Sequence, residues 1–300
     1  MLLAGSCTAH GSAAGPSTAP STAPSTAPSA THTAAAVAAR PSKVLVIVME
    51  NHSAREALRQ MPRLAALATT YGHTTAYRAI THPSLPNYLA LAGGSTFGVT
   101  DDAGPAAHRI AGASVFDAAI ADRKTAKLYA ESMPSRCASG STDRYAVKHN
   151  PWAYFSSPAS RTSCLRYDVP AGTVTAGALR TDVDAGKLPT VGMLVPDICN
   201  DGHDCSLATA DAWLHRWTAA LMSGPDYRAG RLTIVVTFDE DDSSAGNTVL
   251  TVVVAPHTRG VVSARAYSHY SLSRYLSEIA ATRPLRHAAQ APSWRAAFRL

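Results

Sequence analysis

The sequence has few charged and few aromatic side chains, and it contains no long apolar segment. Of its 300 residues, 16% are charged and 7% are aromatic. No apolar run approaches the roughly 20 residues that a membrane-spanning helix requires. The net charge is +6, but the basic residues are dispersed and form no Lys/Arg run. These absences argue against a transmembrane protein and a nucleic-acid-binding surface. Modest positive charge suits an anionic substrate instead.

Cysteine is also scarce, with five in the chain. Four of them lack the C-x-x-C spacing of a zinc ribbon and divide naturally into the pairs Cys137–Cys164 and Cys199–Cys205. Disulfides are typical of exported proteins. Cys7 follows a short apolar start that resembles the end of an export segment without its basic beginning. We therefore expect a secreted or cell-surface protein, either released after export or lipid-anchored through Cys7.

The first forty residues differ in composition from the rest. Residues 16–30 read PSTAPSTAPSTAPSA, a repeat without charge or bulky apolar side chains. Such a repeat is typical of a flexible spacer, so we expect residues 1–42 to be an export-segment remnant and a disordered linker. Residues 43–285 are long enough for one large catalytic domain. Residues 286–300 are basic and Ala-rich, and we expect a loosely attached tail.

Several continuous apolar runs are typical of strands buried on both faces of a parallel sheet. Three of them, residues 43–49, 190–196 and 232–238, each end in polar residues. Segments with helical patterns lie between the apolar runs, at residues 54–71, 114–121, 174–185, 208–222 and 267–281. The pattern predicts an α/β fold with a mostly parallel sheet. Residues 131–170 lack such a pattern, and we expect a long disulfide-stapled loop there.

The segment Thr81–Tyr88 places a serine between two prolines. Pro83 and Pro86 stiffen the backbone around Ser84, so we expect a helix that begins only after Pro86. A serine at such a turn would lie beside unpaired backbone N–H groups and the positive end of a helix dipole. There it can attack and then hold a phosphoryl or acyl group. The alternative is a proline-rich turn with a serine N-cap.

Acidic residues follow the predicted strands. Glu50 follows residues 43–49, and Asp239 to Asp242 follow residues 232–238. Because the carboxyl ends of parallel strands meet at one edge of a sheet, we expect these acids to converge with Ser84. Carboxylates in a row repel one another unless a cation lies among them. The sequence therefore predicts one divalent metal ion, against the alternative of a solvated acidic turn.

Four histidines also lie in the loops expected at this edge, and they are His82, His149, His203 and His269. His203 is held between Cys199 and Cys205 in a short loop. A single loop histidine is more often structural. Four on one edge favour an anion site, where a histidine donates to a phosphate oxygen or protonates a leaving group.

Three stretches together resemble a known family. Met49–Ser53, Thr81–Tyr88 and Thr237–Asp242 occur in the order and spacing of the bacterial phosphoesterase family of acid phosphatases and phospholipases C, within the alkaline phosphatase superfamily. Further matches at Tyr145–Trp152, His203–Asp204 and Tyr267–Tyr270 resemble its compact secreted acid phosphatases, which include phosphatidylinositol-3-phosphatases. The resemblance covers about residues 43–279. It implies a three-layer α/β/α sandwich with a mostly parallel central sheet.

The resemblance also implies roles for individual residues. Ser84 would be the nucleophile that forms a phosphoserine, with His203 and His269 as catalytic histidines. The metal ligands would be Glu50, Asn51, Asp239 and Glu240, and the substrate-binding residues would be Asn51, His82, Asn87 and His149. Two-zinc members of the superfamily carry an Asp-His-Gly type ligand after the last strand. Here residues 243–246 read SSAG, so we expect one metal ion rather than two.

We therefore expect a secreted, metal-assisted phosphatase that hydrolyses phosphate monoesters through Ser84. Its substrates would be small phosphorylated molecules, phosphoinositide headgroups among them, and neither nucleic acid nor a stable protein partner is implied. A phosphodiesterase or phospholipase C could use the same serine. A metal-independent serine acyl hydrolase is disfavoured because Ser84 lacks the G-x-S-x-G turn. A non-catalytic surface binding protein is the remaining alternative.

Overall fold

The structure is a computed structural model that describes residues 10–12, 15 and 40–300. All the helices and strands below belong to one unit, Ala38–Leu300. The predictions for Cys7 and for the repeat of residues 16–30 lie outside the described residues. Within the described part of the chain, no helix is long and apolar enough to cross a membrane.

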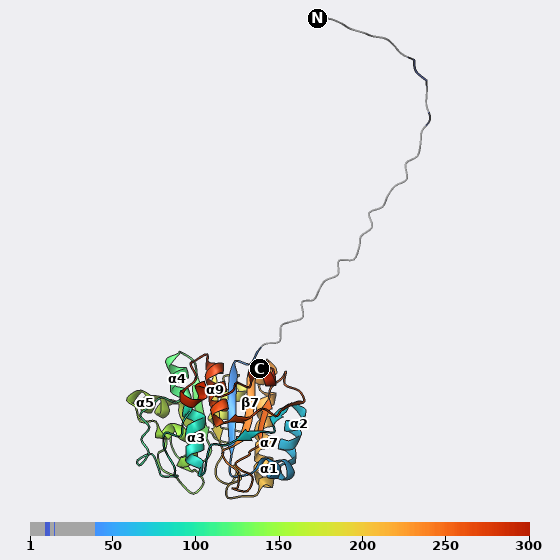
Figure 1. Cartoon of the computed structure of the whole chain (residues 1–300). Coiled ribbons are helices and arrows are strands. Elements are labelled where there is room, and N and C mark those ends of the chain that lie inside the picture. The colour runs from blue at the N-terminus through green and yellow to red at the C-terminus, as the bar shows by residue number, and fades with distance from the viewer. Residues whose placement is uncertain (1–9, 13–14, 16–39) are drawn as a thin grey trace. The chain divides into compact units, whose positions relative to one another are not determined.

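A β-sheet that includes β7 forms the middle layer (Figure 1). It has eight strands in the order β5-β4-β6-β1-β7-β8-β2-β9. Its strands are β1 (Lys43–Met49), β2 (Gly72–Thr74), β4 (Ala126–Ala130), β5 (Asp168–Pro170), β6 (Val191–Val195), β7 (Leu232–Phe238), β8 (Thr251–Val254) and β9 (Val261–Ser263). Strand β1 is parallel to β6 and β7 on either side, whereas β8 is antiparallel to β7 and β2. A separate parallel pair joins β3 (Tyr77–Arg78) and β10 (Tyr267–Ser268). The predicted α/β fold with a mostly parallel sheet is confirmed.

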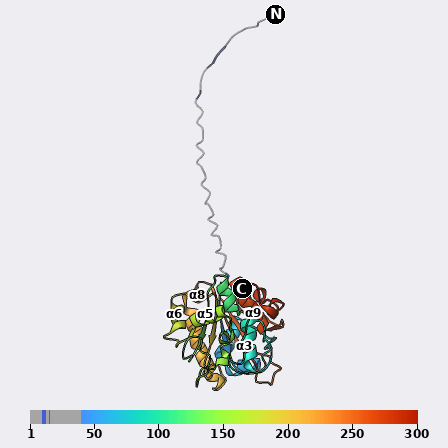
Figure 2. The same ribbon diagram turned by 90° about the vertical axis from the view of Figure 1, so that its left-hand side faces the viewer.

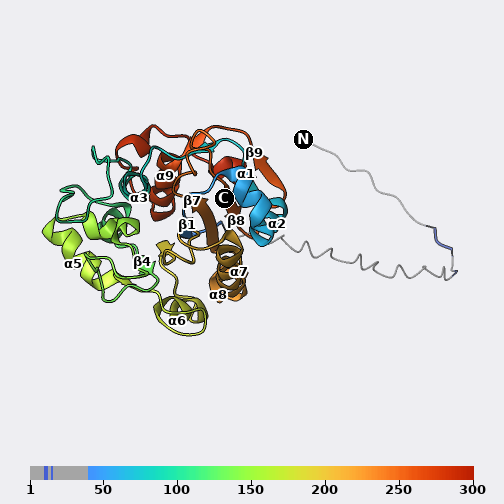
Figure 3. The ribbon, with the colours of Figure 1, turned by 90° about the horizontal axis from the view of Figure 1, so that it is seen from below.

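Helices cover both faces of the sheet. One face carries α3 (Ser84–Gly93), α4 (Val115–Ala121) and α9 (His269–Ala280). The other carries α1 (Ala54–Gln60), α2 (Pro62–Thr70), α6 (Ala178–Asp184), α7 (Leu207–Ser223) and α8 (Pro225–Arg228). Figures 2 and 3 show α3 and α9 on the side of the sheet opposite α6 and α8. Helix α5 (Pro158–Tyr167) covers the β4–β5 edge. The arrangement is the three-layer sandwich that the sequence predicted.

The central strands are buried because both of their faces meet helices. In β1, the side chains of Val44 to Met49 are fully buried, and every residue of β7 is buried. Continuous apolar runs therefore replace the alternating pattern of a half-exposed strand. This burial fixes the ends of β1 and β7 side by side, with Met49 opposite Phe238.

The helix expected over residues 54–71 is two helices. The break falls at Met61, and Pro62 occupies the first turn of α2, where its missing N–H costs no hydrogen bond. The break leaves the apolar pattern of residues 54–71 intact, so the pattern alone did not reveal it. The segment that follows α2 holds two short strands, β2 and β3.

Two expectations about irregular chain are wrong. Residues 131–170 contain α5, β5 and the short helices η1 (Val147–His149) and η2 (Pro151–Tyr154). Residues 286–300 are not loosely attached, since Trp294 and Phe298 are fully buried. This segment contains η3 (Arg286–Ala289) and α10 (Arg295–Phe298), and Trp294 packs against Tyr77 and Tyr275.

Candidate active site

Ser84 is the first residue of α3, not a residue that precedes the helix. Pro86 lies in the first turn, where no N–H is needed, so the helix starts three residues earlier than expected. The expected row of unpaired N–H groups is also wrong. Pro86 has no N–H, and the Leu85 N–H donates to Asp102 Oδ1 at 2.9 Å. The Ser84 side chain is 1% exposed.

The structure brings Ser84 against two carboxylates from neighbouring strand ends. Its hydroxyl donates to Glu50 Oε2 at 3.1 Å, and Glu240 Oε1 lies 3.5 Å away. Glu50 follows β1 and Glu240 lies two residues after β7. Because β1 and β7 are adjacent and parallel, their polar ends meet at the carboxyl edge of the sheet.

Two asparagines hold this arrangement. Asn51 adopts a left-handed backbone conformation (φ 50°) and its N–H donates to Asp239 Oδ1 at 3.2 Å. With its amide nitrogen turned toward the acids, Asn51 donates to Glu50 and Glu240 at 3.2 Å each. Asn87 Nδ2 donates to Glu240 Oε2 at 3.2 Å, while Asn87 Oδ1 accepts from the Ile80 N–H. Both side chains therefore contact the carboxylates that face Ser84.

Glu50 belongs to a group of three side chains whose types commonly bind metal ions. Glu50, His149 and Asp201 are buried and offer ligand atoms within 4.8 Å of one another. His149 Nε2 is 3.3 Å from Glu50 Oε1, and His149 Nδ1 is 3.3 Å from Asp201 Oδ2. Neither ring nitrogen makes a well-directed hydrogen bond, and Asp201 Oδ2 and Asp239 Oδ2 are also without a partner. Unpartnered nitrogen and oxygen atoms of these types fit a divalent cation.

The pKa shifts within this cluster also favour a bound cation. Burial raises the pKa of Glu50 well above its usual value, and nearby Asp239 and Asp201 add to the rise. Burial also raises the pKa of Asp201 and Asp239 to about 7 and that of Glu240 to about 8. Burial lowers the pKa of His149 well below its usual value. Ionising these carboxylates together is therefore unfavourable unless a cation lies among them.

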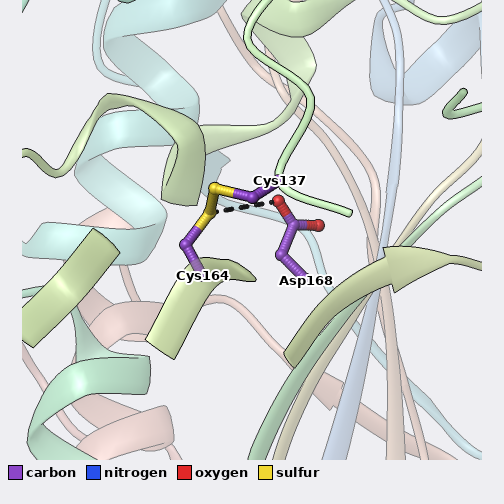
Figure 4. A group of neighbouring side chains, drawn as sticks. All are labelled: Cys137, Cys164 and Asp168. Carbon is purple, nitrogen blue, oxygen red and sulfur yellow. Dashed lines mark hydrogen bonds between the residues drawn. A yellow bond between two sulfur atoms is a disulfide. The ribbon is translucent and has the colours of Figure 1, made fainter. Parts of the chain in front are cut away.

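A second group, Cys137, Cys164 and Asp168, is not a metal site (Figure 4). Cys137 and Cys164 form a disulfide, as Cys199 and Cys205 also do, so both predicted pairs are confirmed. A disulfide sulfur carries no negative charge and is a poor metal ligand. Asp168 Oδ2 lies 3.5 Å from the Cys164 sulfur.

The four histidines occupy different places. His82 contacts Glu240 Oε2 at 3.1 Å and Asp241 Oδ1 at 3.2 Å. His203 is 31% exposed and contacts Asp204, with its ring 6.0 Å from that of His149. His269 is fully buried: its Nε2 contacts the Asp239 carbonyl oxygen, and its Nδ1 lies 3.1 Å from the Tyr77 hydroxyl.

The His269 contacts differ from the expectation of a catalytic histidine. Both ring nitrogens are engaged away from Ser84, and burial lowers the pKa of His269 to about 4. The ring therefore holds the backbone at Asp239. His149 also differs from the expectation, because it lies between two carboxylates rather than in an open phosphate pocket.

Two residues of the site escaped the sequence patterns. The Tyr88 hydroxyl donates to Glu50 Oε1, and its ring stacks on His149 at 5.1 Å. Tyr88 lies one helical turn after Ser84, which is the signal that was available. Asp201 follows β6 in the loop closed by the second disulfide, where Gly202 adopts a φ of 100° that favours glycine. Its place at a strand end was the available signal.

The fold is similar to that of solved structures from the alkaline phosphatase superfamily. A superfamily protein from Vibrio parahaemolyticus superposes with a TM-score of 0.59 over 86% of this chain and 72% of its own length, at 10% identity. The lipoteichoic acid synthase LtaP from Listeria monocytogenes superposes with a TM-score of 0.55 over 85% of this chain and 77% of its own, at 7% identity. At such identities these likenesses concern the fold alone.

Sequence comparison identifies the family to which the chain belongs. The chain belongs to the Phosphoesterase family, whose profile matches residues 37–281. It is 32% identical to the phosphatidylinositol-3-phosphatase of Mycobacterium tuberculosis over 268 residues, which are 86% of this chain and 83% of that protein. It is 31% identical to the phosphate-repressible acid phosphatase of Penicillium chrysogenum over 68% of this chain and 50% of that protein, so it spans about half of that relative. The chain is a phosphoric ester hydrolase, and the predicted family is confirmed.

Proposed function

We propose that the protein is an exported, metal-assisted phosphatase that hydrolyses phosphate monoesters through a phosphoserine at Ser84, with phosphoinositides among its substrates. The observation that carries this proposal concerns Ser84, the first residue of α3. Its hydroxyl donates to the buried carboxylate of Glu50 at 3.1 Å. The likeness to a phosphatidylinositol-3-phosphatase supports the substrate class. The two disulfides support export.

In the first step, Ser84 Oγ attacks phosphorus in line with the departing alcohol. The serine–phosphorus bond forms, the ester P–O bond breaks, and the serine proton passes to Glu50 Oε2, its hydrogen-bond acceptor. His203, at the exposed rim, gives a proton to the leaving alkoxide. Asn87 and Asn51 keep Glu240 and Glu50 in place during this step.

In the second step, water cleaves the phosphoserine. The attacking water gives a proton to His203, the phosphorus–serine bond breaks, and the Ser84 oxygen recovers its proton from Glu50. Inorganic phosphate leaves and both side chains return to their starting states. Glu50 and His203 thus each accept a proton in one step and donate it in the other.

A divalent ion fits beside these residues. Glu50, Asp201, Asp239 and His149 offer the buried, unpartnered or closely spaced atoms that would hold it. Bound there, the ion would supply positive charge for the serine oxygen and the phosphate oxygens. This ligand set differs from the expected one, because Asn51 and Glu240 contact the cluster from the Ser84 side instead.

An activity panel tests the proposal. Wild-type protein and Ser84→Ala are assayed on p-nitrophenyl phosphate, bis(p-nitrophenyl) phosphate and phosphatidylinositol 3-phosphate, with and without a chelator. We expect wild-type monoester turnover that falls after chelation, and a loss of at least about a thousandfold in Ser84→Ala with its circular dichroism spectrum intact. Full activity in the variant would refute the role of Ser84.

The panel also separates the alternatives. Faster diester than monoester turnover would favour a phosphodiesterase or phospholipase C. A serine acyl hydrolase needs a histidine base at the serine, whereas the hydroxyl of Ser84 contacts only carboxylates among the side chains described. Its ester hydrolysis would also survive chelation.

A further inference from the structure

Lys148 lies beside the catalytic cluster and has no part in the chemistry above. It belongs to η1, directly before His149, and η1 packs against α3. Its ammonium donates to Asp102 Oδ2 at 3.1 Å, and its side chain is 22% exposed. An ammonium group has three donors. One contact with Asp102 leaves donors available on the side open to solvent.

Asp102 connects this ammonium to the nucleophile. Its other oxygen, Oδ1, accepts at 2.9 Å from the N–H of Leu85, the residue after Ser84. One carboxylate therefore bridges the start of α3 and the Lys148 ammonium. The bridge fixes a positive charge near the end of the helix where a phosphate bound to Ser84 would lie.

A substrate phosphate placed against Ser84 would lie at the end of α3 that the Lys148 ammonium reaches. η1 packs against α3, and Asp102 connects the ammonium to the N–H of Leu85. A phosphate bound there would be attracted by the positive charge.

We propose that Lys148 binds the substrate phosphate and selects dianionic monoesters over monoanionic diesters, with Asp102 as the positioning residue that directs the ammonium. The proposal rests on the phosphatase function proposed above and deepens it. A fixed ammonium attracts a dianion more strongly than a monoanion at the same distance. The partly exposed pair with Asp102 alone would contribute little to stability, so the main effect of Lys148 falls on substrate binding.

The test compares four proteins: wild type, Lys148→Met, Lys148→Arg and the matched control Lys127→Met. Lys127 also pairs with an aspartate, Asp182, at similar exposure (27%), but it lies at the start of β4, away from the catalytic edge. The measurements are kcat and KM on p-nitrophenyl phosphate and bis(p-nitrophenyl) phosphate, and the inhibition constants of inorganic phosphate and diethyl phosphate. Thermal unfolding checks that each variant folds.

For Lys148→Met we expect KM for the monoester and the inhibition constant of inorganic phosphate to rise about tenfold or more, with a smaller change in kcat. Diester turnover and diethyl phosphate inhibition should change by less than about threefold. Lys148→Arg should retain most phosphate affinity, and Lys127→Met should match wild type. Equal losses for both phosphate classes, or no loss in Lys148→Met, would overturn the proposal.

Asp102→Asn tests the positioning role. It keeps an oxygen for the Leu85 N–H but removes the charge that holds the ammonium. We expect KM to rise with kcat nearly unchanged; tighter phosphate binding would show that Asp102 competes with substrate and would overturn this part. The inhibition constants report phosphate binding and do not require Ser84 to act as a nucleophile. If Ser84→Ala remained active, the function above would fail while the Lys148 result could still be read.

Discussion

Asp168 shows at the scale of one residue how burial changes an ordinary carboxyl group. Asn150 Nδ2 donates to its Oδ2 at 2.8 Å, but its Oδ1 has no partner. Burial raises the pKa of Asp168 to about 7. Between about pH 4 and about pH 7 the folded protein therefore keeps a proton that the unfolded chain has lost, so this residue makes stability fall as pH rises.

Replacing Asp168 with Asn should remove that part of the pH dependence. We expect the free energy of unfolding of wild type to fall more steeply than that of Asp168→Asn between about pH 4.5 and about pH 7.5. Urea unfolding at several pH values measures both slopes. Asp143→Asn, an exposed position, is the control and should keep the wild-type slope. Identical slopes in all three proteins would contradict the prediction.

The residues of the candidate site differ in how far the sequence could reveal them. Ser84, Glu50 and Glu240 were predictable because each stands next to a strand or helix end with a clear local pattern. Asp201 also follows a strand, but the sequence does not distinguish it from the other polar residues of its loop, whose path depends on Gly202 and the disulfide that closes the loop. The ring of His269 was misplaced because its orientation depends on how α9 packs against the sheet.

At the scale of the element, helix α2 depends on a residue from another helix. Met61, its N-cap residue, makes no side-chain cap. Instead Asp211 of α7 accepts from the Leu64 N–H at 3.0 Å and the Arg63 N–H at 3.2 Å. A buried carboxylate thus does the work of a cap and joins α2 to α7.

Removing this shared cap should destabilise the protein. We expect Asp211→Ala to lower the free energy of unfolding by about 2 kcal/mol, because two N–H groups lose their acceptor, and Asp211→Asn to cost less. Urea unfolding measures both. Asp184→Ala removes an exposed aspartate paired only within its own helix and should cost well under that amount. A cost for Asp211→Ala no larger than for Asp184→Ala would count against the capping role.

Element boundaries were predictable where a continuous apolar run marked a strand buried on both faces, and the predictions failed where the pattern was uninformative. Strands β1 and β7 match their predicted ranges because they are apolar throughout. Helix α5 was missed since its sequence, PASRTSCLRY, has no apolar stripe and packs at the sheet edge around a disulfide. The terminal segment around Trp294 was misjudged because its many basic residues obscured the buried side chains of Trp294, Phe298 and Leu300.

At the scale of the whole molecule, a cation bound by the acid cluster would couple folding to cation binding. Four carboxylates and His149 meet at the carboxyl edge from separate segments of the chain, so an ion bound there would hold those segments together. A ligand that binds only the folded state stabilises it by about 2.7 kcal/mol at a hundred times its Kd. The cluster should therefore make the melting temperature depend on divalent cations.

Thermal unfolding with a chelator and with added Mg²⁺, Ca²⁺, Mn²⁺ or Zn²⁺ measures this dependence. We expect at least one cation to raise the Tm of wild type by several degrees, about the shift that such a free energy gives in a domain of this size. Asp201→Asn should lose most of the increase because it removes one ligand. Asp184→Asn should keep it. A wild-type Tm that none of these cations changes would contradict a metal at this site.

Strand β1 lies between the region of residue 40 and Leu300 at one end and the candidate active site at the other. Arg40, shortly before the strand begins, lines one cavity together with Leu300, whereas Glu50 directly follows the strand's last residue. Protein coupled to a bead through residue 40 would therefore turn its catalytic edge toward the surrounding solution. Coupling through Ser244, in the loop after β7, would press that edge against the support. Assays on vesicle-borne phosphoesters are best built on the first orientation.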